Sequence, residues 1–141
     1  MKDYTISESF TLPSKGLIYD TKFDPIVTIH SMQTRHEMMR LSPGEYPYKS
    51  LCDIIDDCMV NDIPISSYDM FFGDYQYLLY KLRTVTYGKE YKLSVTCPIC
   101  GETYEGSIDL DELEVLDNVD SFNNYLEFDL PYSKKHVVLN Y

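Results

Sequence analysis

Cys97 and Cys100 are the two residues of this chain whose type and spacing best suit a chemical role. They stand in the sequence Cys-Pro-Ile-Cys-Gly, and two thiolates at this spacing on a tight turn can face one zinc ion. Gly101 relieves the strain after the second cysteine. Because structural zinc takes four protein ligands, the motif indicates half of a zinc site.

The source of a second ligand pair is left open by the sequence. The usual pair some tens of residues further on is missing, and Cys52 and Cys58 lie six residues apart on a predicted helix, so they face different directions. A hairpin that keeps the knuckle shape without metal is the reading that the missing pair favours. The alternatives are zinc ligands from a second chain, or a single ligand from one of the histidines, which are His30, His36 and His136. Zinc is thus the only cofactor indicated.

Catalytic motifs are missing from the sequence. It contains no G-x-S-x-G elbow, no glycine-rich phosphate loop and no H-E-x-x-H. His36 and Glu37 lack the second histidine of that last motif, and the neighbouring carboxylates Asp56 and Asp57 point apart on a helix. We therefore expect that the protein is not an enzyme.

The chain is strongly acidic, with 12 Lys and Arg against 23 Asp and Glu, for a net charge of −11. Between Lys92 and Lys134 there are ten carboxylates and no basic residue. Affinity for nucleic acid depends on Lys and Arg that displace counterions, so a nucleic-acid partner is not expected. The acidic run is either a solvated face or a surface for a basic protein partner.

Neither a membrane span nor a secretion signal is visible. No apolar run approaches the roughly 20 residues that cross a bilayer, and the first residues lack the apolar stretch of a signal peptide. We expect no membrane partner and a reducing cytoplasm, in which the four cysteines are thiols or metal ligands.

The elements that position the cysteines follow from apolar periodicity. A helix capped by Ser66 or Ser67 and ending near Gly88 carries one apolar stripe, and a half-buried strand then leads to Cys97. Residues 103–110 return as the second strand of a hairpin, and Asp111 starts a short helical turn. The stripe of the helix consists of Phe71, Tyr75, Leu78, Leu79 and Leu82.

Upstream, two strands at residues 5–12 and 25–30 flank a turn at residues 13–16, after which residues 17–19 return as an extended arm. Thr34 and Glu37 read as the capping box of a first helix whose apolar side is Met38, Met39 and Leu41. A second helix follows the loop at residues 46–48, and its stripe is Leu51, Ile54, Ile55, Cys58 and Met59.

These elements predict an α+β fold, in which an N-terminal arm and a zinc-ribbon-like hairpin surround two or three amphipathic helices. The expected regions are a β arm at 1–33, a helical region at 34–88, a knuckle hairpin at 89–116 and a C-terminal extended segment at 117–141 that can open a further domain.

Tyrosine occurs 14 times and tryptophan not at all. Tyrosine suits protein contacts because its ring is buried while its hydroxyl finds a hydrogen bond, although codon bias in an AT-rich genome gives the same excess. The candidate interface residues are Leu12, Pro13, Lys15, Gly16, Leu17, Tyr19, Tyr77 and Tyr80.

The chain resembles the baseplate hub protein family of contractile-tailed phages of the T-even type. The resemblance covers most of the sequence and rests on the order of its motifs, which are residues 12–19, 29–37, 51–59, 73–74, 78–88, 97–101 and 108–110. Family members usually continue past a strand like residues 128–139, so this chain is either a short member or part of a longer protein.

The resemblance implies a structural or assembly protein of the virion tail baseplate, made in the host cytoplasm. It implies no enzymatic activity and contacts with other baseplate or tail proteins, with a homo-oligomer left open. Two alternatives remain at this point: a cytoplasmic zinc-ribbon adaptor that binds protein or nucleic acid, and a tail assembly chaperone absent from the mature virion.

Overall fold

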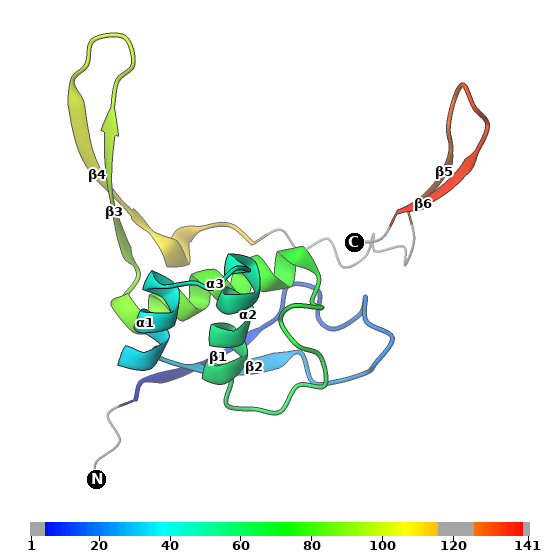
Figure 1. Ribbon diagram of the computed structural model, residues 1–141, viewed down its shortest axis with the longest axis horizontal. Helices are drawn as coiled ribbons and strands as arrows, with labels where there is room; N and C mark the ends of the chain where they lie inside the picture. Colours follow the sequence, from blue (N-terminus) through cyan, green and yellow to red (C-terminus); the bar gives the residue numbers. More distant parts are fainter. Residues whose placement is uncertain (1–4, 116–125, 140–141) are drawn as a thin grey trace.

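The computed structural model describes residues 5–115 and 126–139. Within them the fold is α+β, as predicted, with three α-helices and six short strands that pair as separate two-stranded sheets (Figure 1). None of the helices in this part of the chain is long and apolar enough to span a membrane. The elements are β1 (Ser7–Thr11), β2 (Ile26–His30), α1 (Thr34–Leu41), α2 (Pro47–Cys58), α3 (Phe72–Tyr87), β3 (Glu90–Thr96), β4 (Thr103–Asp109), the 3-10 turn η1 (Leu110–Glu112), β5 (Leu126–Asp129) and β6 (His136–Leu139).

The core lies between the β1–β2 sheet and the helices. The two strands are antiparallel, with Phe10 opposite Val27, and α3 packs on both β2 and α2. The alternation of β2 points Val27 and Ile29 into this core, where α2 and α3 contribute their buried stripes. The core residues are Leu12, Val27, Ile29, Cys52, Ile54, Ile55, Cys58, Met70, Tyr75, Leu78 and Leu82.

Helix α2 confirms the predicted stripe, since Ile54, Ile55 and Cys58 are buried. The helix starts earlier than predicted, because Pro47 occupies its first turn, where its missing N–H has no helical partner to lose. Helix α3 starts later than predicted, at Phe72. The predicted caps Ser66 and Ser67 instead donate to the Asp56 carboxylate of α2, at 2.7 and 2.8 Å.

Helix α1 differs from the prediction at its start and on its apolar side. Gln33 rather than Thr34 is the N-cap, and its backbone N–H donates to Nδ1 of His36 over 3.0 Å. The buried residue of this helix is His36. The predicted apolar side is exposed, because the helix presents its single buried position to α2 and turns Met38, Met39 and Leu41 to solvent.

The expected extended arm at residues 17–19 is absent, because these residues belong to a series of turns that folds back on the body. Asp74, in the first turn of α3, is fully buried and accepts hydrogen bonds from the Ser14 N–H at 3.0 Å, the Ser14 hydroxyl at 2.5 Å and the Tyr19 hydroxyl at 2.7 Å. Burial and the contact with Asp74 raise the pKa of Tyr19. Three hydrogen bonds to one carboxylate therefore anchor the turn that was expected to project.

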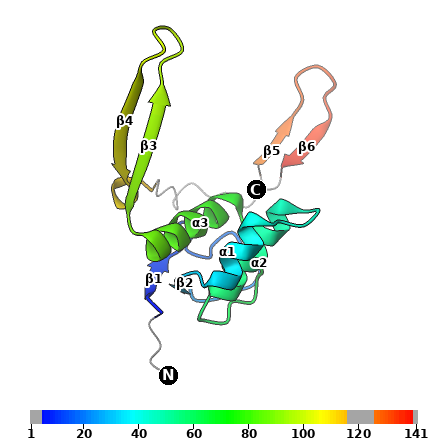
Figure 2. The ribbon, with the colours of Figure 1, turned by 60° about the vertical axis from the view of Figure 1, so that its left-hand side comes forward.

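Two hairpins stand apart from the core. The β3–β4 hairpin rises from the end of α3, and both views show it directed away from the helices (Figures 1 and 2). Gly88 ends α3 at φ +86°, which a side chain would strain, and so sets the direction in which β3 leaves. The second hairpin consists of β5 and β6, with Phe128 opposite Val137. Residues 117–125 and 140–141 of the predicted C-terminal extended segment lie outside the described residues.

Candidate interaction site

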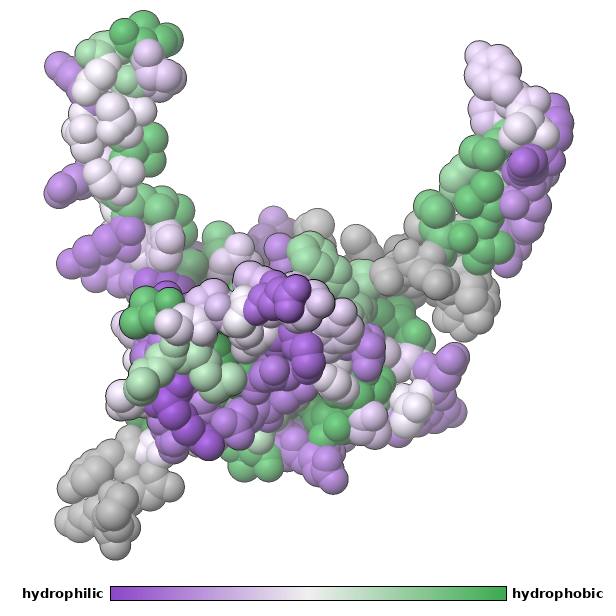
Figure 3. Space-filling model, viewed as in Figure 1, coloured by the Kyte–Doolittle hydropathy of each residue, from purple (hydrophilic) through white to green (hydrophobic). Residues whose placement is uncertain are grey.

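The β3–β4 hairpin has one apolar face and one polar face. Its register places Tyr91 opposite Ile108, Leu93 opposite Gly106, and Val95 opposite Tyr104. Paired and alternate residues share a face, so these side chains gather on one side while the intervening polar residues occupy the other. Figure 3 shows hydrophobic atoms along one side of the hairpin and hydrophilic atoms along its outer side.

This apolar face is exposed over most of its length. Tyr91, Val95, Tyr104 and Ile108 expose between 38% and 60% of their surface. A two-stranded hairpin is at best marginally stable in water by itself, and burial of an apolar face is what stabilises such ribbons. The apolar face therefore has the properties of a protein-contact surface.

The root of the hairpin is held against α3 by two cations. The Arg83 guanidinium lies 4.5 Å from the ring centroid of Tyr91 and donates to the Gly88 carbonyl over 3.2 Å. Lys81 forms an ion pair of 2.9 Å with Asp111, just beyond β4. These contacts set the angle at which the apolar face meets the helices.

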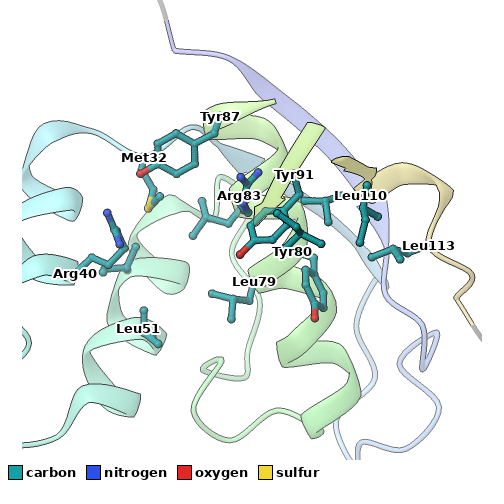
Figure 4. Close-up of a pocket in the computed structure, with 14 residues that line it drawn as sticks. Met32, Arg40, Leu51, Leu79, Tyr80, Arg83, Tyr87, Tyr91, Leu110 and Leu113 are labelled. Atoms are coloured by element: carbon teal, nitrogen blue, oxygen red, sulfur yellow. The ribbon is translucent and has the colours of Figure 1, made fainter. Parts of the chain in front are cut away.

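A groove of about 850 Å³ opens where the hairpin meets the helices (Figure 4). Tyr91 and Leu93 of β3 form one wall, and Leu79 of α3 and Leu51 of α2 lie on the helical side. Its lining is mainly apolar and continues directly into the apolar face of the hairpin. The lining residues are Met32, Arg40, Leu51, Ile54, Leu79, Tyr80, Leu82, Arg83, Tyr87, Tyr91, Leu93, Ile108, Leu110 and Leu113. We call this surface the root groove.

A second groove of about 580 Å³ adjoins the root groove, and Tyr80, Leu110 and Leu113 line both. Three of the predicted interface residues, Pro13, Tyr77 and Tyr80, come together around it. Tyr77 and Lys81 share one side of α3, since the Lys81 ammonium lies 5.7 Å from the Tyr77 ring centroid.

The other predicted interface residues lie elsewhere. Leu12 belongs to the core, where 1% of its surface is exposed, so its side chain is not available to a partner. Tyr19 is half-buried over Asp74. Lys15 and Gly16 form the left-handed part of the turn, with φ of +51° and +71°, and Leu17 is exposed. Their role in an interface stays a prediction.

Carboxylates lie at one edge of the apolar surface, at the root of the hairpin. Glu90 and Asp109 face each other at the root, and Asp111, Glu112 and Glu114 follow β4. Lys89 and Lys81 engage Asp109 and Asp111, and the Lys89 hydrogen bond lowers the pKa of Asp109. The remaining carboxylates at this edge give it a negative field.

The predicted knuckle lies at the exposed tip of the hairpin. The Gly101 N–H donates to the Cys97 carbonyl at 2.9 Å, the Cys97 N–H donates to the Glu102 carbonyl at 2.8 Å, and Gly101 has φ +74°. Backbone N–H groups of Cys100 and Ile99 lower the pKa of the Cys97 thiol. Within the described residues, no group of three or more His, Cys, Asp and Glu side chains is placed to hold a metal, so metal binding at Cys97 and Cys100 stays a prediction.

His36, Asp57 and Cys58 form a cluster that the sequence did not predict, in which His36 and Cys58 are buried and Asp57 is exposed. Because Nδ1 of His36 accepts from Gln33, its Nε2 donates to Asp57 over 2.9 Å, while Cys58 Sγ lies 3.4 Å from Nδ1. This order resembles a nucleophile, base and orienting acid, but Cys58 is fully buried and its burial raises the thiol pKa to about 12. The cluster therefore holds α1 on α2 and offers no accessible thiolate.

The comparison with protein families decides the affiliation of this chain. The model of the T4 bacteriophage base plate protein family matches residues 18–139. The chain belongs to this family. The matched stretch contains all three helices, the root groove and the whole β3–β4 hairpin. Neither a curated protein nor a solved structure shows a significant match.

Membership in the baseplate family confirms the resemblance at the level of the baseplate. It makes the chain a baseplate protein of a T4-type phage tail, hence a structural component of the virion tail. The predicted assignment to the hub is more specific than this match. The roles as a zinc-ribbon adaptor and as a chaperone absent from the virion gain no support from it.

Proposed function

We propose that this baseplate protein is a structural or assembly subunit of the hub, acts by contacts with other proteins, and has no enzymatic role. The chain is made in the host cytoplasm and joins its neighbours there. The observation that carries the proposal is the continuous apolar surface formed by the root groove and the adjoining face of β3–β4. Such a surface is typical of a protein contact, because apolar area of this extent is normally buried against a partner.

The partner is expected to be another baseplate or tail protein that presents an apolar segment flanked by Lys or Arg. Apolar side chains would fill the root groove, while basic residues would meet the carboxylates beyond β4. The same charge opposes nucleic acid as the ligand, since phosphate would meet Asp111, Glu112 and Glu114.

Two adjacent residues of β4 allow a matched test. Ile108 lines the root groove on the apolar face, whereas Ser107 lies on the polar face opposite Lys92. Ile108→Asp and Ser107→Asp add the same charge one residue apart. If the groove is the docking surface, Ile108→Asp lowers the yield of complete tails roughly tenfold or more, the effect of losing about 1.4 kcal/mol of contact energy, and Ser107→Asp stays near wild type.

The experiment introduces each variant into the phage, counts infectious particles, and looks for peptides of the chain in purified virions by mass spectrometry. Circular dichroism of the two purified variants verifies that both remain folded. Equal tail yields from the two variants would show that the root groove is not the docking surface. Virions without peptides of the chain would exclude a resident subunit.

A further inference from the structure

The knuckle, residues 97–101, presents two thiols at the most exposed end of the β3–β4 hairpin. Cys100 is exposed, and Ile99 between the two cysteines exposes 94% of its surface. The backbone already holds the turn through the Gly101-to-Cys97 and Cys97-to-Glu102 hydrogen bonds. The turn is thus prepared for a soft divalent cation.

Within residues 5–115 and 126–139, the knuckle thiols make up only half of the ligands that such a cation needs. The other cysteines, Cys52 and Cys58, are fully buried in the core. His36 of α1 is buried and hydrogen-bonded to Asp57 of α2, and no described residues form a group of three ligands with the knuckle thiols. Since structural zinc takes four ligands in tetrahedral geometry, the missing pair has to come from another polypeptide segment.

A second copy of the same chain supplies the missing pair through its own two knuckle thiols, so that all four ligands are cysteines. A two-fold axis through the ion would relate two tips and bring four thiolates to one point. The hairpin projects away from the helices, so its tip is open to a second copy (Figure 2). Val95 and Tyr104, paired just below the knuckle and exposed by 60% and 58%, give the two tips an apolar surface on which to meet.

We propose that two copies of this protein share one Zn²⁺ through Cys97 and Cys100 of each copy. Zn²⁺ displaces a proton from each of the four thiols and forms four Zn–S bonds, with no change of oxidation state. Each copy carries a net charge of −11 and has Glu102 next to the knuckle, so repulsion opposes association until the cation is bound. The dimer is therefore metal-dependent. The inference goes beyond the proposed function, because it concerns a metal and requires no other tail protein.

The test uses the purified 141-residue chain with added Zn²⁺ and a phosphine reductant that prevents disulfides. Zinc per chain is measured by elemental mass spectrometry, and the molar mass by light scattering during gel filtration. We expect one zinc for every two chains, a dimeric mass, and a return to monomer without zinc after chelation. Substitution of Co²⁺ should give the visible bands of a tetrahedral cobalt–thiolate site.

Three variants distinguish the ligands from the tip surface. Cys97→Ser and Cys100→Ser should each abolish both the zinc and the dimer, whereas Ile99→Ser, in the same turn, should keep the one-to-two zinc stoichiometry. Circular dichroism should be unchanged in all three, because the tip has no part in the core. One zinc per monomer, a dimer that survives chelation at low ionic strength, or zinc retained by both cysteine variants would overturn the proposal.

Discussion

At the scale of single residues, Asp74 decides the shape of the N-terminal region. Its buried carboxylate receives three hydrogen bonds from Ser14 and Tyr19, and the Tyr19 hydroxyl also accepts from the Phe71 N–H at 3.0 Å. Asp74 lies in the first turn of α3, where the helix dipole favours negative charge. One side chain thus joins the turn after β1 to the start of α3.

Replacement of Asp74 should destabilise the whole domain. Asp74→Ala leaves buried donors of Ser14 and Tyr19 without an acceptor, and we expect the free energy of unfolding to fall by about 2–4 kcal/mol. Urea denaturation followed by circular dichroism measures the loss. Asp69→Ala, at an exposed position of the preceding loop, is the control and should change stability by less than about 0.5 kcal/mol. Equal losses in the two variants would contradict a special role for Asp74.

Cys58 should make stability fall at alkaline pH. An unfolded thiol ionises near pH 8.5, whereas burial raises the pKa of Cys58 to about 12. Between these two values the unfolded chain loses a proton that the folded chain keeps, so the free energy of unfolding decreases as pH rises. The slope from this one group is at most about 1.4 kcal/mol per pH unit.

Urea denaturation at about pH 8 and about pH 10 measures this dependence, and Cys58→Ala is the comparison because it removes only this titration. Burial also raises the pKa of Tyr75 to about 12, but that contribution is present in both proteins and cancels. Identical pH slopes in the wild type and the variant would show that the Cys58 thiol does not stay protonated in the folded state.

At the scale of elements, the junction between α3 and β3 controls where the hairpin points. Gly88 permits the sharp change of direction, and Arg83 then holds Tyr91 over the end of the helix. The Leu110 N–H donates to the Lys89 carbonyl at 2.9 Å and closes the root of the hairpin. The walls of the root groove are therefore positioned by few contacts.

Loss of Arg83 should loosen this junction without unfolding the core. Arg83→Ala removes the cation–π contact and the hydrogen bond to Gly88, together about 1 kcal/mol, so the Leu110 amide should exchange its hydrogen about fivefold faster. Hydrogen exchange followed by NMR measures the rate. Lys49→Ala, which breaks a surface ion pair on α2, should leave the Leu110 amide unchanged. If the Leu110 amide exchanges at the same rate in Arg83→Ala as in the wild type, contacts other than those of Arg83 hold the hairpin in its orientation.

For the molecule as a whole, the apolar surface and the large negative charge have opposite effects on association between copies of the chain. The root groove favours association, whereas a net charge of −11 keeps copies of the chain apart. Salt screens the repulsion and leaves apolar contacts intact, since the Debye length falls from about 10 Å at 0.1 M to about 3 Å at 1 M. Association of the isolated chain should thus depend on ionic strength.

Without zinc, the sedimentation coefficient should increase as NaCl is raised from about 0.05 to about 0.5 M, because screened copies can then cover one another's grooves. Analytical ultracentrifugation with a chelator present measures this. Leu113→Asp, at the rim shared by both grooves, should reduce the increase, while Leu41→Asp, on the exposed side of α1, should not. A wild-type sedimentation coefficient that does not change with NaCl would contradict this balance between apolar attraction and charge repulsion.

The elements whose signals are local could be predicted from the order of the amino acids. Alternation of Tyr91, Leu93 and Val95 predicted an amphipathic strand, and Gly88 marked the end of α3. The spacing of Ile54, Ile55 and Cys58 predicted the buried side of α2. Each signal is a backbone preference or a periodicity that acts within a few residues, so the order of elements and the α+β class could be predicted. The resemblance to the baseplate family rests instead on the order of its motifs.

Features that depend on residues far apart in the chain follow from the folded structure and not from local sequence patterns. The burial of Asp74 requires Ser14, 60 positions earlier, and the exposure of the apolar residues of α1 follows from the way His36 meets Asp57 and Cys58. The root groove likewise joins Leu51, Leu79 and Leu93 from three elements. Local periodicity does not specify which faces of separate elements meet, because that choice is made by packing and charge across the whole fold.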